Sequence, residues 1–117
     1  MTEPSDFLAT EVVFDNAVVR VWTMDLAPGE ESTLHRHNLD YMFIYPSASR
    51  IEVRPQGEPA RTFDFAAGYV QYVHVGDGVV HQIKNVADEP HRHIVVEVKQ
   101  TPSQAPSSDN GRKEPAA

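Results

Sequence analysis

Three histidines have the spacing expected of a metal site. His35 and His37 are separated by one residue in a segment that predicts a β-strand, so both rings project from the same face. His81 lies in a second predicted strand, which a barrel can bring beside the first. Imidazole binds first-row divalent metals, and three protein ligands with an open position are typical of catalytic sites. We therefore expect one divalent metal ion, Fe, Mn, Ni or Zn, at His35, His37 and His81.

Other kinds of chemistry find little support in the composition. The chain has no cysteine, which excludes thiolate ligands, a cysteine nucleophile and a disulfide framework. No serine stands in a nucleophile-elbow context, so a Ser-His-Asp mechanism is not indicated. The remaining option is a nitrogen-rich or mixed nitrogen–oxygen metal site.

Which residue faces the fourth coordination position of the metal depends on how the chain continues after His37. An uninterrupted strand would point Tyr41 at the metal and Asp40 away, whereas a turn at residues 38–39 would bring Asp40 inward. The sequence leaves both alternatives open. We favour Tyr41 as a catalytic residue that hydrogen-bonds a metal-bound water or substrate, because its ordinary pKa of about 10 makes the phenolate costly at neutral pH.

Three further histidines are interpreted as lying outside the site. His74 belongs to a predicted strand but has no ligand-like spacing. His91 and His93 follow the turn at residues 88–90, and we expect them to form the solvent-exposed start of a strand. The alternative, in which this pair lines the mouth of a barrel, stays open.

The elements that must position these residues are short strands. Turn residues such as Pro28-Gly29 separate several of them, and no window shows a sustained period of 3.6 residues. The predicted strands are Glu11–Phe14, Ala17–Leu26, Thr33–His37, Tyr41–Tyr45, Arg50–Arg54, Arg61–Phe65, Tyr69–Val75, Val79–Lys84 and His93–Lys99. Many short strands without a helix predict an all-β sandwich or small barrel.

The length of 117 residues corresponds to about one domain. We expect residues 1–6 to be flexible, residues 7–100 to form the barrel, and residues 101–117, which are polar and proline-containing, to be a disordered tail. The net charge of −7 argues against nucleic-acid binding. No signal-peptide pattern and no run of about 20 apolar residues is present, so we expect a cytoplasmic protein without membrane contact.

Two motifs resemble those of the cupin superfamily. Residues 29–37 read GxxxxxHxH, like the opening of the first cupin motif, and residues 78–85 read GxxHxxxN, like the end of the second. The segment HRHNLDY at 35–41 is similar to small single-domain cupins of the β-alanine-degradation-like type. The resemblance covers Phe14–Lys99 and implies an RmlC-like, cupin-type β-barrel (a jelly roll or double-stranded β-helix).

The chain also departs from the family pattern. The glutamate ligand that cupins carry four residues after the second histidine is Tyr41 in this chain. The glycine after the first motif is missing, and Gly76 stands where the second motif has a proline. The resemblance therefore implies a site of three histidines, as in some cupin dioxygenases, and not the family's mixed set.

These features together favour a metal-dependent enzyme, an isomerase, lyase or dioxygenase, that acts on a small organic molecule. Three neutral ligands leave the metal its full charge, and an inward-facing Arg20, Arg50 or Arg54 would bind a carboxylate, so we expect an anionic substrate. The alternative is a non-catalytic module that binds a small ligand or a metal. We expect a homodimer, with Phe7–Phe14 as the exchanged or edge-pairing strand.

Overall fold

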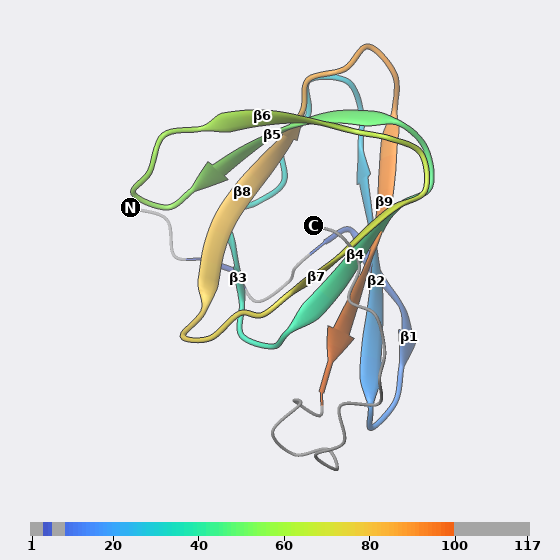
Figure 1. Cartoon of the computed structure of the whole chain (residues 1–117), viewed down its shortest axis with the longest axis vertical. Helices are drawn as coiled ribbons and strands as arrows, with labels where there is room; N and C mark the ends of the chain where they lie inside the picture. The colour runs from blue at the N-terminus through green and yellow to red at the C-terminus, as the bar shows by residue number, and fades with distance from the viewer. Residues whose placement is uncertain (1–3, 6–8, 100–117) are drawn as a thin grey trace.

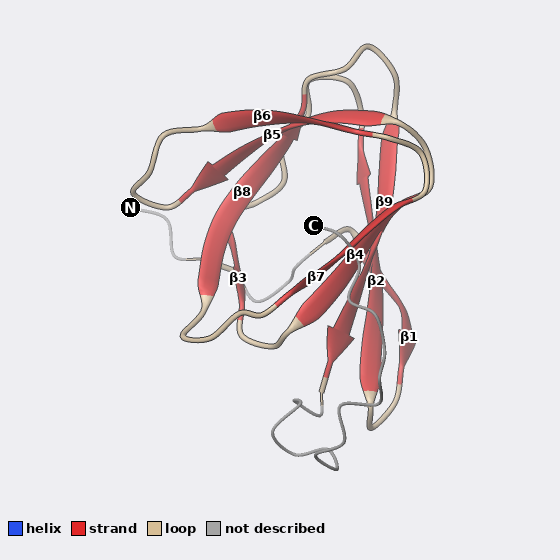
Figure 2. Cartoon of the chain, in the orientation of Figure 1, coloured by secondary structure: helices blue, strands red, loops and turns tan. Residues whose placement is uncertain are grey.

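The computed structural model describes residues 4–5 and 9–99, and every regular element within them is a strand (Figure 2). The strands are β1 (Glu11–Asp15), β2 (Val19–Leu26), β3 (His35–His37), β4 (Tyr41–Tyr45), β5 (Ser49–Pro55), β6 (Arg61–Phe65), β7 (Tyr69–Val73), β8 (Val79–Asn85) and β9 (His91–Val98). The predicted all-β class is therefore confirmed. These described residues contain no helix with the length and apolar character that a bilayer crossing needs.

The strands form two antiparallel sheets. One sheet has the order β1-β2-β9-β4-β7 and the other has the order β3-β8-β5-β6 (Figure 1). Several neighbours within each sheet come from distant parts of the sequence, since β2 pairs with β9 and β5 pairs with β8. This topology places β3 and β8, the two strands that carry the predicted ligands, side by side.

Strand alternation builds the core as the sequence predicts. In β2 the side chains of Trp22, Met24 and Leu26 are buried, while those between them are half-buried. Trp22 packs with Tyr41 and Val95, and Met24 and Leu26 pack in a neighbouring cluster. Burying each such side chain contributes about 1.5–3 kcal/mol, so these clusters supply much of the force that closes the barrel.

The short strand β3 differs from its prediction. It begins at His35 instead of Thr33. Before it, Glu31 forms an isolated bridge with Lys84, and the Ser32 amide donates to the Ile83 carbonyl at 2.8 Å. On its other side, the Ser5 amide donates to the Leu34 carbonyl at 2.8 Å and the Ser5 carbonyl accepts from the Arg36 amide at 2.9 Å. β3 is therefore held from both sides.

Within residues 1–6, which the sequence predicts to be flexible, Ser5 is paired with β3. The flexibility of the segment stays a prediction. The expected barrel boundary at residue 100 and the expected disordered tail, 101–117, lie outside the described residues.

The turn before β8 depends on glycine. Gly76 has a φ angle of 65° and Gly78 has a φ angle of 120°, and residues other than glycine rarely adopt positive φ angles of this kind. The Gly78 amide donates to the Val75 carbonyl at 3.3 Å and closes this turn. The turn delivers the chain into β8, so the motif glycine at 78 fixes the strand that carries His81.

Candidate metal centre

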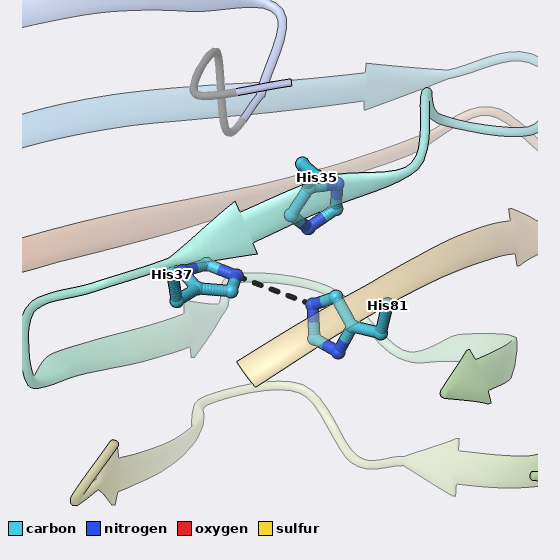
Figure 3. Close-up of side chains that lie close together, drawn as sticks. All are labelled: His35, His37 and His81. Atoms are coloured by element: carbon cyan, nitrogen blue, oxygen red, sulfur yellow. Dashed lines mark hydrogen bonds between the residues drawn. The ribbon is translucent and has the colours of Figure 1, made fainter. Parts of the chain in front are cut away.

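The three predicted ligands converge inside the barrel. His35 lies directly opposite His81 in the β3–β8 register, and His37 shares the face of His35. The ring centroids form a nearly equilateral triangle with sides of 5.0, 4.7 and 5.0 Å. One ring nitrogen from each residue lies within 4.8 Å of the other two (Figure 3).

The distance between two of these nitrogens suits a shared metal ion. Nε2 of His37 lies 3.2 Å from Nε2 of His81. Two nitrogens that bind one tetrahedral zinc ion are about 3.4 Å apart, given Zn–N bonds of about 2.0–2.1 Å. In addition, Nδ1 of His37 is buried and has no hydrogen-bond partner among the described residues. The donor set and its spacing therefore fit a divalent metal ion.

Burial keeps these rings neutral. It lowers the pKa of His35, and it lowers the pKa of His81 to about 3, with His35 adding to the effect. The pKa of His37 is lowered furthest, first by burial and then by repulsion from His81 and His35. At neutral pH each ring thus has a free lone pair, as metal ligation requires.

A hydrogen bond fixes the tautomer of His35. Its Nδ1 lies 2.9 Å from the Thr33 carbonyl oxygen, which can only accept, so the proton is on Nδ1 and Nε2 is bare. Metal-binding histidines commonly use this kind of backbone contact to orient the ring.

Tyr41 faces the site and Asp40 does not, although the strand is interrupted after His37 and β4 lies in the other sheet. Tyr41 is buried, lines the cavity with the histidines, and stacks on His37. Its burial raises the pKa of the phenol, so the hydroxyl stays protonated. Asp40 turns away from the site, and its carboxylate accepts hydrogen bonds from the Val75 amide at 2.9 Å and the Tyr72 hydroxyl at 2.7 Å.

The cavity at this centre is small and uncharged. Its volume is about 80 Å³, and its lining residues are Met24, His35, His37, Tyr41, Phe43, Tyr45, Val53, Phe65, His81, Ile83, His93 and Val95. None of the arginines in the described residues lines it. Arg20 pairs with Asp15, Arg50 pairs with Asp64, and Arg54 pairs with Glu31 and Glu52. These three arginines therefore do not supply an inward-facing partner for a carboxylate.

The expectation that His91 and His93 lie at a solvent-exposed strand start is wrong. Instead of forming a solvent-exposed strand start they are 4% and 5% exposed, and His93 lines the cavity. In β9 the two histidines share a face with the buried Val95, but the opposite face carries Ile94, Val96 and Val98, so alternation does not mark the inner face. His74 does lie away from the centre, with its side chain 78% exposed and its Nδ1 at 3.2 Å from Asp40.

Comparison with known proteins identifies similar folds. No protein-family model and no curated protein sequence matches the chain. A cupin domain from Bordetella pertussis Tohama I has a TM-score of 0.70 at 26% identity, over 85% of this chain and 98% of that chain. An RmlC-like cupin family protein with a double-stranded β-helix fold from Methanocaldococcus jannaschii has a TM-score of 0.62 at 16% identity, over 84% and 85%. A double-stranded β-helix domain protein from Klebsiella pneumoniae has a TM-score of 0.61 at 20% identity, over 83% and 82%.

Proposed function

Since the chain is a small cupin domain with the double-stranded β-helix fold, we propose that it is a metal-dependent enzyme acting on a small organic molecule. In this proposal His35, His37 and His81 bind one divalent metal ion, Fe, Mn, Ni or Zn. The observation that carries it is the convergence of three neutral, buried or half-buried imidazoles, with ring nitrogens within 4.8 Å, at one cavity.

The ligand set also indicates the class of substrate. Three neutral imidazoles do not offset the charge of a divalent ion, and the cavity lining contains no acidic or basic side chain apart from histidine. The bound metal would act as a Lewis acid or, as iron, in O₂ chemistry, so isomerisation, elimination and dioxygenation are the proposed reaction classes. A small anion that chelates through two oxygens, such as a hydroxy or keto acid, matches this charge and the cavity of about 80 Å³.

Tyr41 is the proposed catalytic residue of this site. It holds His37 by stacking, and as a protonated phenol lining the cavity it offers a hydroxyl that donates to a bound molecule. A hydroxyl in this role orients the substrate and supplies or receives a proton during the reaction.

Metal analysis of untagged protein tests the proposal. Wild type should retain about one equivalent of metal after dialysis, and His35→Ala, His37→Ala and His81→Ala should each bind at least about tenfold more weakly. His74→Ala is the matched control, because that ring is exposed and lies outside the site. Metal content that is unchanged in all three variants, or reduced equally in the control, would contradict the proposal.

A non-catalytic binding module is the second candidate. The aromatic lining and the small volume favour it, since Tyr41, Phe43, Tyr45 and Phe65 restrict the space in front of the histidines. Cobalt-substituted protein separates the two functions. A visible spectrum that changes when hydroxy or keto acids are added indicates an open coordination position and supports the enzyme, whereas an unchanged spectrum supports the module.

We also propose a second copy of the chain as a partner. β1 forms an edge of its sheet, and Val13 and Phe14 on it are each 52% exposed. An apolar edge strand of this kind is available for pairing with the same strand of another copy.

A further inference from the structure

Hydrogen-bonded side chains connect the cavity with the outside of the barrel. His93 lines the cavity, and its Nδ1 lies 2.6 Å from Nε2 of His91. Nδ1 of His91 in turn lies 2.7 Å from the hydroxyl oxygen of Ser49. Ser49 lines a separate surface hollow of about 560 Å³, which is formed by residues of β5, β6 and the segment 86–89. The contacts thus run without a gap from an interior cavity to a surface one.

The middle of this path is shielded from solvent. His91 and His93 are 4% and 5% exposed, and the ring of Tyr45 lies parallel to His93 with centroids 4.8 Å apart. Tyr45 also lies against His91, with centroids 5.2 Å apart. A proton that passes between the two histidine rings therefore moves through the hydrogen bond that joins them.

Both rings carry the single proton that such a path needs. Burial lowers the pKa of His91 to about 4 and that of His93 to about 3, the latter with a further effect from His91. At neutral pH each ring is neutral, so it donates at one nitrogen and accepts at the other. The two hydrogen bonds then have only two possible arrangements. In the first order, His93 donates to His91 and His91 donates to Ser49. In the second order, Ser49 donates to His91 and His91 donates to His93.

The surroundings of Ser49 can satisfy the first order. Its hydroxyl donates to the Ser47 carbonyl at 3.2 Å, which leaves its oxygen free to accept from Nδ1 of His91. Nε2 of His91 then accepts from Nδ1 of His93, and Nε2 of His93 is bare. A bare nitrogen on a residue that lines the cavity can take a proton from a molecule bound there if the Nδ1 proton of His93 leaves in the same transfer.

We propose that Ser49, His91 and His93 form a proton relay between the surface hollow and the cavity. The relay deepens the proposed function, because it gives the site a route by which a bound molecule exchanges a proton with solvent. His93 is the residue that meets this molecule, and His91 and Ser49 act through it.

The transfer balances without any further reactant. Nε2 of His93 takes a proton from the bound molecule, and the Nδ1 proton of His93 moves to Nε2 of His91. The Nδ1 proton of His91 moves to the Ser49 oxygen, whose own proton leaves to solvent in the hollow. One proton leaves the cavity, one enters the solvent, and both rings end neutral in the second order. Return of one proton restores the first order.

Nuclear magnetic resonance of metal-free protein with ¹⁵N-labelled histidine tests the relay. The experiment measures the tautomers of His91 and His93 and the rate at which the ring proton of His93 exchanges with water. We expect Ser49→Ala to slow this exchange by at least about tenfold, because exchange then requires opening of the barrel. Ser49→Thr, which keeps the hydroxyl, should restore the rate.

Two controls make the result specific. Ser47→Ala retains the carbonyl that Ser49 uses, so it should leave the exchange rate unchanged. The backbone amide of Val95, which lies in the same strand, should exchange equally in wild type and Ser49→Ala. Equal slowing of this amide and the His93 ring would show that barrel opening had changed, and would overturn the relay.

A second variant covers the middle of the path. His91→Phe keeps an aromatic ring and removes both nitrogens, so we expect the tautomer of His93 to change and its ring exchange to slow. Unchanged tautomer and exchange in both His91→Phe and Ser49→Ala would overturn the proposal. Because these measurements use no metal, protein that shows the relay but binds no metal would refute only the proposed function.

Discussion

Tyr41 lies flat against His37, with ring centroids 3.9 Å apart and ring planes 14° from parallel. His37 has no hydrogen-bond partner at Nδ1 among the described residues, whereas His35 is held by the Thr33 carbonyl. Two candidate ligands on one strand are therefore oriented by different forces, His37 by stacking and His35 by a hydrogen bond. Tyr41 thus contacts the face of the His37 ring.

This difference predicts how Tyr41 variants behave. Tyr41→Phe keeps the stacked ring, so we expect Zn²⁺ affinity within about twofold of wild type, while Tyr41→Leu should weaken it by about tenfold or more. Competition with a chromophoric chelator measures both. If Tyr41→Phe loses as much affinity as Tyr41→Leu, then the hydroxyl, and not the stack, supports the metal.

Asn85, the last residue of the second motif, is predicted to be structural. It is fully buried, its amide donates to the carbonyls of Leu26 and Glu89, and its oxygen accepts from the Ala87 amide. Asn85→Ala leaves these buried groups unpaired and should reduce the free energy of unfolding by about 2–4 kcal/mol, measured by urea denaturation. The metal stoichiometry of the folded fraction should match wild type, and a variant that is stable but metal-free would contradict this assignment.

Acid should destabilise the metal-free protein through its buried histidines. The pKa of His91 is lowered from 6.5 to about 4 by burial, so the unfolded chain binds this proton at a higher pH than the folded one. Stability is therefore full above about pH 6.5 and is lost as the pH falls toward 4, with about 1 kcal/mol lost by pH 5.5 from His91 alone. Urea unfolding at pH 7.5 and 5.5 should show a smaller difference between the two pH values for His91→Phe than for wild type. An equal or larger difference would contradict the prediction.

The apolar edge of β1 predicts the oligomeric state. Val13 is 52% exposed on this edge, so Val13→Lys should place a charge in a β1–β1 contact and convert a dimer to a monomer. Sedimentation velocity at several concentrations measures this. Phe63→Lys, on the exposed strand β6, is a control of similar exposure at 38% and should leave the dimer intact. A wild type that is monomeric at all concentrations would contradict the proposal.

Sequence patterns predicted the strands and the meeting of three histidines because both depend on local alternation and a few motif positions. They failed at His91 and His93 because alternation tells which residues share a face, but not which face the barrel encloses. Both faces of β9 carry charged or polar residues near its start, so no hydrophobic contrast marks the inside. Ser5 was also missed, since its pairing with β3 uses only backbone groups, which leave no trace in side-chain composition.

The pairing of Ser5 with β3 connects a residue near the start of the sequence to the strand that carries His35 and His37. The Ser5 carbonyl accepts from the amide of Arg36, the residue between His35 and His37, so Ser5 is hydrogen-bonded to the backbone that carries both rings. An affinity tag, fusion or crosslink that displaces Ser5 would therefore pull on the strand that carries His35 and His37. Modification near Ser5 should therefore disturb the positions of these two rings more than modification at a site remote from β3.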